Sequence, residues 1–276
     1  MNKKLSIAEQ RELTVRKANE IIQRSRFSLS AQQQKILLYL ISKIKPQDKE
    51  FTEYTMSVIE FCDICGITKS GRTYEEIKAA IKAIADKSMW IELGDEAGTD
   101  ALIRWIENPK ILKKTGFIKV KLNEDMKPFL LELKKNYTSY ELLWTLKFKS
   151  KYSIKLYELL KSVHYNELDT YSYSFTVERL QWLLDSNYKL YADFKRNALV
   201  PAITEINRYS DKIVTYKEIR EGKAHSVKSI EIQVDTKDAI ERIRLNDEIQ
   251  KELGIDENQI TVWDMLQEGE KKNEDI

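Results

Sequence analysis

The chain has 276 residues, of which 46 are Lys or Arg and 44 are Asp or Glu, and 42% are hydrophobic. This length suffices for two domains that each bury a core, and the composition excludes a disordered or fibrous protein. No apolar run approaches the roughly 20 residues that span a bilayer, and the N-terminus lacks the apolar segment of a signal peptide. With only two cysteines in addition, the sequence predicts a cytoplasmic protein without membrane contact.

The residue composition also argues against several classes of enzyme. Only eight glycines occur, and none belongs to a phosphate-binding or dinucleotide-binding glycine motif. His164 and His225 are far apart and form no paired-histidine motif. Cys62 and Cys65 lack the two further ligands that zinc needs, and their spacing suits the apolar face of a helix. We therefore expect no catalytic residue, cofactor or metal.

Charge is distributed unevenly along the chain. Residues 1–135 contain 25 basic and 19 acidic residues, whereas the last 41 residues contain 6 basic and 12 acidic residues. A mildly basic body with an acidic tail fits a polyanionic partner, although this signal alone is weak.

The first half of the chain predicts three helices followed by strands. Ser30 with Gln33 forms a capping box ahead of the apolar stripe of the first helix. Ser57 with Glu60 and Thr73 with Glu76 predict the starts of the second and third helices, the third running over Thr73–Lys87. Period-2 alternation then predicts strands at Met89–Leu93, Ala101–Ile106 and Phe117–Leu122.

The second half repeats this order about 119 to 122 residues later. The stripe Leu37, Leu40, Ile41 and Ile44 has a counterpart in Leu156, Leu159, Leu160 and Val163. The counterpart of the third helix runs over Tyr191–Tyr209, with Pro201 expected to kink it. A hairpin is predicted over Ile213–Ile219 and Val227–Val234, with Gly222 at its tip. The fold class is therefore predicted as α+β, mostly α, with two tandem winged helix-turn-helix domains related by an internal repeat.

Three segments carry a family resemblance: Val15–Ile41 (VRKANEIIQRSRFSLSAQQQKILLYLI), Ser150–Lys161 (SKYSIKLYELLK) and Phe194–Asn207 (FKRNALVPAITEIN). They resemble the iteron-binding initiator Rep proteins of theta-replicating plasmids, and the resemblance covers about residues 14–235. It implies a bacterial protein that binds repeated origin DNA as a monomer and often an operator as a dimer, without enzymatic activity of its own. The acidic C-terminal 40 residues lie outside the resemblance.

The repeat suggests a division into five parts. These are an N-terminal arm or helix (1–28), a first winged-helix domain for dimerisation and accessory DNA contact (29–124), a connector (125–149), the main DNA-reading domain (150–235) and the acidic tail (236–276). Within the tail, the apolar patch Val262, Trp263, Met265 and Leu266 suits either a partner or the body of the protein.

In a helix-turn-helix domain, the second helix of the motif lies in the major groove and reads bases. In the second copy, the outer face of that helix predicts four base-reading residues: Asp193, Arg196, Asn197 and Val200. In the first copy the equivalent face lacks Arg, which favours a supporting contact and a dimerisation role.

Phosphate contacts are predicted at the borders of the motifs. The candidates in the second copy are Lys147, Lys149, Lys151, Lys189, Lys195, Lys217, Arg220, Lys223 and Lys228, and those in the first copy are Lys69, Arg72 and Lys78. The lysines at 147, 149 and 151 also flank a helix N-terminus, which attracts anions. Trp105 either serves an interface or, as we favour, packs in the core.

The sequence thus predicts a plasmid replication initiator that binds double-stranded origin repeats. It is expected to form a homodimer through the first domain, to help recruit a host initiator or replicative helicase, and to repress its own gene. The alternative is a tandem winged-helix transcription regulator without a replication role.

Overall fold

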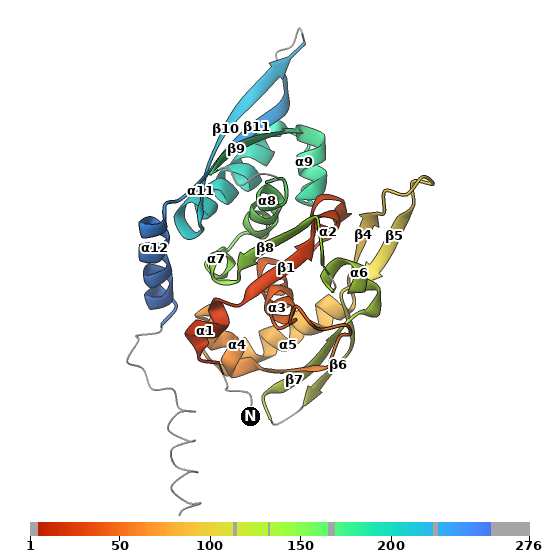
Figure 1. Ribbon diagram of the computed structural model, residues 1–276, viewed down its shortest axis with the longest axis vertical. Coiled ribbons are helices and arrows are strands. Elements are labelled where there is room, and N and C mark those ends of the chain that lie inside the picture. Colours follow the sequence, from red (N-terminus) through yellow and green to blue (C-terminus); the bar gives the residue numbers. More distant parts are fainter. Residues whose placement is uncertain (1–4, 113–114, 132, 165–168, 223–225, 255–276) are drawn as a thin grey trace, which may run out of the picture.

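The computed structural model describes residues 5–112, 115–131, 133–164, 169–222 and 226–254. Its helices are α1 Ile7–Arg11, α2 Asn19–Gln23, α3 Ala31–Ser42, α4 Val58–Cys65, α5 Gly71–Ala85, α6 Lys127–Leu130, α7 Leu143–Leu146, α8 Lys151–Ser162, α9 Val177–Leu183, α10 Tyr191–Phe194, α11 Val200–Tyr209 and α12 Ala239–Glu252. Its strands are β1 Thr14–Ala18, β2 Ser25–Arg26, β3 Tyr54–Ser57, β4 Ser88–Glu92, β5 Asp100–Arg104, β6 Ile106–Leu112, β7 Phe117–Leu122, β8 Tyr137–Glu141, β9 Thr170–Thr176, β10 Lys212–Glu221 and β11 Ser226–Thr236. Figure 1 shows two helical units, one around α3–α5 and one around α8–α11, each with its own sheets.

The first unit consists of α3, α4 and α5, each begun by a serine side chain. Ser30 forms the predicted capping box with Gln33, and Ser57 accepts a hydrogen bond from the Glu60 backbone N–H. The predicted cap at Thr73 is wrong, because Ser70 caps α5 and accepts the Thr73 N–H. The Thr73 hydroxyl instead donates to the Thr68 carbonyl, so that α5 begins at Gly71 rather than at Thr73.

The strands of the first unit form two small sheets rather than one wing. One has the order β2-β4-β5 and the other β3-β7-β6, and all neighbouring strands are antiparallel. Strand β3, directly before α4, was not predicted. Strand β6 was predicted only at Ile106, and it continues to Leu112.

The second unit repeats the first with a longer wing. Helix α8 packs on α11, and the long hairpin β10–β11 continues into β9 in a sheet of order β10-β11-β9. The N-caps Ser57 and Thr176 stand 119 residues apart, and each follows a strand that pairs with its own wing. The repeat therefore extends to a strand before the second helix, and the prediction of two tandem winged-helix domains is confirmed.

The reading helix of the second unit is not a continuous α-helix. Between α10 and α11 the segment Lys195–Leu199 forms a π-turn, in which the Val200 N–H donates to the Lys195 carbonyl five residues earlier. Pro201 lies just beyond this turn and has no N–H to offer the Asn197 carbonyl. The helix is therefore interrupted at the predicted place by a π-turn, which contains one residue more than an α-helical turn.

The N-terminal arm and the connector pair with each other. Strand β1 of the arm and β8 of the connector form an antiparallel ribbon, with Val15 opposite Tyr140. Figure 1 shows this ribbon between the two units, and α2 packs against α8. One continuous cluster of buried apolar side chains includes residues of both units, of the arm and of the connector. The division into five parts therefore stays a prediction, and the connector is a structural element in its own right.

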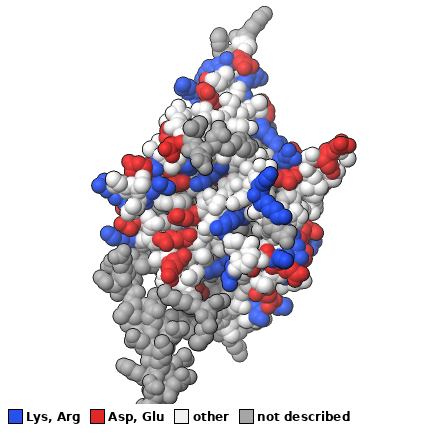
Figure 2. Space-filling model, viewed as in Figure 1, with Lys and Arg blue, Asp and Glu red and all other residues white. Residues whose placement is uncertain are grey.

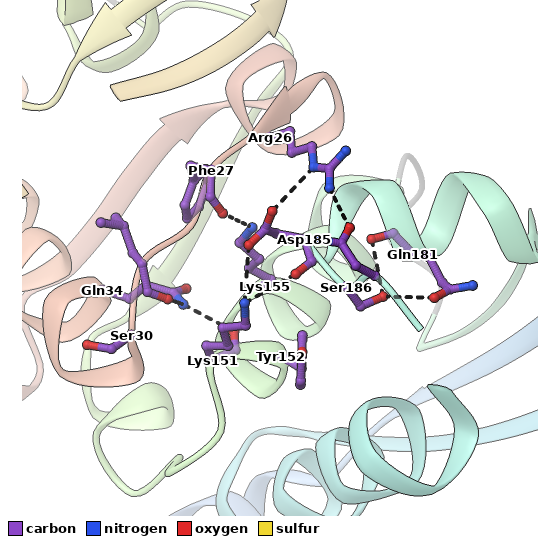
Figure 3. Close-up of polar contacts among 12 residues, drawn as sticks. Arg26, Phe27, Ser30, Gln34, Lys151, Tyr152, Lys155, Gln181, Asp185 and Ser186 are labelled. Atoms are coloured by element: carbon purple, nitrogen blue, oxygen red, sulfur yellow. Dashed lines mark hydrogen bonds and ion pairs between the residues drawn. The ribbon is translucent and has the colours of Figure 1, made fainter. Parts of the chain in front are cut away.

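Polar contacts also join the two units (Figure 3). Asp185 after α9 accepts from Arg26 at 3.3 Å and from Lys151 at 3.1 Å. Lys155 on α8 donates to the Phe27 carbonyl at 2.6 Å, and its ammonium lies 3.8 Å from the centre of the Phe27 ring. Two of these bonds cross from the arm to the second unit, so they fix how the units face each other.

Candidate nucleic-acid interface

The outer face of the second reading helix carries the four predicted base-reading residues. Arg196, Asn197 and Val200 are exposed and Asp193 is half-exposed, whereas Phe194, Ala198 and Leu199 between them are buried. The Arg196 guanidinium bonds the Asp193 carboxylate at 2.8 Å, and 75% of the Arg196 side chain remains accessible. An accessible guanidinium can form a two-pronged contact with a guanine edge, so this face is suited to reading bases.

The same face continues beyond the proline with residues that were not predicted. Thr204 and Arg208 are exposed and lie four and eight residues after Val200. The Thr204 hydroxyl donates to the Val200 carbonyl, and the Arg208 guanidinium lies 4.9 Å from the centre of the Tyr209 ring. The helical spacing of Thr204 and Arg208 from the predicted base-reading residues, counted through the π-turn, could have placed both on this face.

Some of the basic side chains at the wing of the second unit form ion pairs. Glu218 on β10 accepts from Lys195 and from Arg220, each at 2.8 Å, and its pKa is lowered first by the bond with Lys195. Lys217 and Lys228 are exposed on the two strands of the hairpin. Lys223 lies outside the described residues. Among the described residues of this wing, the accessible cations are thus Lys217 and Lys228, together with the partly accessible Arg220.

The predicted anion site at the N-terminus of α8 is already filled by the protein. The Glu205 carboxylate accepts from the backbone N–H groups of Lys149 and Ser150 and from the Ser153 hydroxyl. A carboxylate satisfies these N–H groups in the same way as a phosphate would. In this structure the helix end therefore holds the Glu205 carboxylate, and phosphate contacts by the neighbouring lysine side chains stay a prediction.

The lysines around that helix end differ in whether they form ion pairs or are exposed. Lys147 pairs with Glu252 of α12 at 2.7 Å, and Lys151 pairs with Asp185. Lys149 is exposed, and so is Lys189 in the turn before α10. Lys149 and Lys189 are therefore the better placed of these predicted phosphate contacts.

The first unit offers a mixed surface, and α5 includes Arg72, which was predicted to precede this helix. Each predicted cation there lies close to an acidic neighbour. Lys69 pairs with Asp63 at 2.6 Å, Arg72 with Glu76 at 2.9 Å, and Lys78 with Glu75 at 2.8 Å. Arg72 is the most accessible of the three, with 88% of its side chain exposed, against 53% for Lys69 and 19% for Lys78. The surface of α5 is electrostatically mixed, which suits a supporting role better than base reading.

Two tryptophans of the first unit differ in burial. Trp105 is 2% exposed and packs edge-on against Phe27 at 4.9 Å, so it belongs to the core as we favoured. Trp90 on β4 is 53% exposed, and its cross-strand partner Leu102 on β5 is 56% exposed. This apolar pair on a protruding hairpin (Figure 1) was missed because an exposed Trp is unusual in a strand.

Cys62 and Cys65 are buried in α4, as expected of core residues. Burial raises the pKa of the Cys65 thiol to about 12, which removes its reactivity at neutral pH. No group of metal-ligating side chains is found among the described residues, and no described helix is long and apolar enough to cross a membrane. On the face shown in Figure 2, acidic and basic side chains intermingle, so charge sign alone does not mark the interface on this side.

Sequence comparison decides the family. Residues 14–161 match the domain described as initiator replication protein WH1, and residues 176–234 match the initiator Rep protein WH2 domain. The chain belongs to the initiator Rep protein family. It is 24% identical over 217 residues to a replication initiation protein of Escherichia coli, which covers 76% of this chain and 67% of that protein.

The fold agrees with a solved initiator. The crystal structure of the Pi initiator protein in complex with iteron DNA matches with a TM-score of 0.66 at 18% identity, covering 83% of this chain and 99% of that one. This Rep protein is therefore a replication initiator with WH1 and WH2 domains, and the reading as a simple transcription regulator is not favoured.

Proposed function

We propose that this Rep protein initiates plasmid replication by binding directly repeated double-stranded sites, the iterons, at its origin. It then helps to recruit a host initiator or replicative helicase, and it represses its own gene. The observation that carries the proposal is the exposed face of the π-interrupted reading helix, with Arg196 and Asn197 at its centre. Binding of iteron DNA by Pi, which shares the fold, supports it. The protein acts by binding and assembly rather than by catalysis.

In this proposal the two units have unequal roles. The second unit reads bases through α10 and α11 and holds the backbone through exposed lysines such as Lys149, Lys189 and Lys217. The first unit adds contacts from α5, where 88% of the Arg72 side chain is accessible. Footprinting of the purified protein on DNA flanking its gene tests the proposal. Protection of directly repeated sites next to an AT-rich segment is expected, and protection of one isolated palindrome would favour a transcription regulator.

Substitutions separate base reading from phosphate binding. Arg196→Ala is expected to weaken binding to the specific site by about 1–3 kcal/mol and to affect scrambled DNA far less. Arg196→Lys keeps the charge but loses the planar fork, so it should lose specificity as well.

Lys149→Ala is the matched control, because the Lys149 backbone bonds to Glu205 are unaffected by truncating the side chain. This variant should weaken specific and scrambled duplexes alike and lower the salt slope by about one. The measurement is a band shift on both duplexes across a salt series. If Arg196→Ala weakened both duplexes equally, the assignment of this helix to the groove would be wrong.

We also propose that the first domain forms the homodimer through the β4–β5 hairpin. Strand β5 lies at the edge of the sheet β2-β4-β5, and the exposed Trp90–Leu102 pair lies beside this edge. Pairing of two such edges about a two-fold axis would bury both apolar pairs.

Replacement of both Trp90 and Leu102 by Ser should therefore shift sedimentation of the free protein toward the monomer. Ile59→Ser, which removes an apolar side chain 59% exposed on α4, should leave self-association unchanged. A wild-type protein that stays monomeric at all concentrations would contradict the dimer.

A further inference from the structure

Helix α12 crosses from the second unit to the first. At its start, the Lys237 ammonium bonds the Asn207 carbonyl at the end of α11, at 2.7 Å. At its end, the buried side chain of Leu253 lies against Gly66, where an added Cβ would approach the Leu253 side chain to 2.6 Å. In Figure 1, α12 begins near α11 and ends at the level of α1. The chain therefore leaves α12 beside the turn of the first helix-turn-helix, because Gly66 stands five residues before Gly71, the first residue of α5.

The end of α12 is held firmly in this place. The Arg11 guanidinium donates to the Leu253 carbonyl at 3.0 Å and to the Asp63 and Ile64 carbonyls at the end of α4. It also donates to the Gln250 side chain at 2.7 Å. One buried cation thus joins the last turn of α12 to the last turn of α4, so the end of α12 is fixed on the body.

An acidic side chain of α12 already occupies a predicted DNA contact. The Glu252 carboxylate lies 2.7 Å from the Lys147 ammonium, and the bond with Lys147, aided by the nearby charge of Arg208, lowers the pKa of Glu252. Lys147 is a predicted phosphate contact, and Arg208 lies on the exposed face of the reading helix. A carboxylate and a phosphate compete for the same ammonium group.

The sequence after Glu252 extends this negative charge. Residues 255–276 contain seven acidic and two basic residues. Extended, 22 residues reach up to about 70 Å, which exceeds the length of either reading helix several times over. The segment is thus long enough and negative enough to follow the cationic surface on which DNA would lie.

We propose that the acidic C-terminal segment, from Glu252 through residue 276, is an intrachain competitor of DNA that covers the cations around Lys147 and Arg208. This inference rests on the proposed function, because it assumes that these cations face DNA. Its consequence is that weak, non-specific DNA cannot displace the segment, whereas an iteron with base contacts can. The segment would then raise selectivity by weakening the phosphate contribution that all sequences share.

Three variants of the full chain test the proposal. Truncation after Gly254 should tighten binding to scrambled DNA on the order of tenfold at low salt, and the gain should shrink as salt rises. Glu252→Gln should give a smaller gain of about two- to fivefold. Asp247→Asn is the matched control, because Asp247 is an exposed acidic residue on the same helix with no ion pair in the described part of the chain, and it should change nothing. Circular dichroism and urea unfolding confirm that each variant is folded.

A mutant cycle locates the effect. In a Lys147→Gln background, Glu252→Gln should no longer tighten DNA binding, because the cation that it would release is gone. A synthetic peptide of residues 252–276 added to the truncated protein should restore weak binding, and the same peptide with Asn and Gln in place of Asp and Glu should not.

Equal DNA affinity of the full and truncated chains would overturn the competitor while leaving iteron binding intact. Weaker binding by the truncated chain would also overturn it and would assign the segment to DNA or partner contact instead. Failure of both chains to bind repeated sites would overturn the proposed function and the competitor together.

Discussion

Arg11 is a charged side chain with no exposed surface, and its hydrogen bonds explain why it is tolerated there. Its guanidinium donates to four backbone carbonyls, those of Asp63, Ile64, Gln250 and Leu253, and to the Gln250 side chain. Burial lowers its pKa to about 10, which still leaves it charged at neutral pH. Carbonyls at helix C-termini lack helical partners and carry partial negative charge, so they suit a cation.

Arg11→Met should therefore cost about 3–5 kcal/mol of unfolding free energy, because it leaves several buried carbonyls without a donor. Arg72→Met is the control, since Arg72 is 88% exposed, and it should change stability by less than about 0.5 kcal/mol. Urea unfolding followed by circular dichroism measures both. A loss below about 1 kcal/mol for Arg11→Met would show that water replaces the guanidinium.

At this scale the sequence could identify core positions but not long-range polar partners. Helical periodicity predicted that Leu37 and Leu156 are buried, and both are. It could not predict that Glu205 caps α8, because the capped groups lie 52 to 56 residues earlier in the chain. Nor does any local pattern link Arg11 to Leu253, since 242 residues separate them.

At the scale of elements, helices were predictable where a side chain caps them and strands were missed where they are polar. Serines at positions 30 and 57 fixed the starts of α3 and α4 correctly. Strand β9 buries Phe175 alone, and β3 buries Met56 alone, so neither shows a clear alternation. These strands form because they pair with wing strands whose backbone N–H and C=O groups would otherwise lack partners. Their positions therefore depend on residues far away in the sequence.

The π-turn in the reading helix gives a prediction about specificity. Pro201→Ala would supply the N–H that the Asn197 carbonyl lacks and would let an α-helical register form. Loss of the extra residue would rotate Arg196 relative to α11 by about 100°. We expect a folded protein whose affinity for the specific site falls at least about tenfold, with little change on scrambled DNA.

Pro46→Ala makes the same substitution in an exposed loop and serves as the control. Band shifts on both duplexes measure the effect. Wild-type affinity of Pro201→Ala for the specific site would show that the π-turn does not position the base-reading face.

At the scale of the whole molecule, the arrangement of the two units depends on buried polar contacts that no sequence pattern predicts. Residues 125–149 were predicted only as a connector, and its strand β8 pairs with β1 and lies against α8. The contact of Lys155 with Phe27 joins α8 to the arm, and burial lowers the pKa of Lys155 to about 7. The packing of α8 against the arm is thus coupled to the protonation of one lysine.

This coupling predicts a pH dependence of stability. Because the folded pKa of Lys155 lies near 7 and an unfolded lysine titrates near 10.4, the unfolded chain binds more protons between these values. Stability should therefore rise with pH, by about 1 kcal/mol between pH 7 and pH 8. The window ends there because burial raises the pKa of Cys65 to about 12, and an unfolded thiol that ionises near 8.5 then favours unfolding.

Urea unfolding at pH 7.0, 7.5 and 8.0 measures this rise, and two substitutions assign it. Lys155→Met keeps a long side chain against Phe27 without an ionisable group, so the rise should largely disappear. Lys110→Met, at a lysine 62% exposed on β6, should retain it. If the wild-type protein lost stability over this range, or if Lys155→Met kept the full rise, Lys155 would be charged in the folded protein throughout. The link between the two units would then be an ion held by the Phe27 carbonyl and ring rather than a neutral amine.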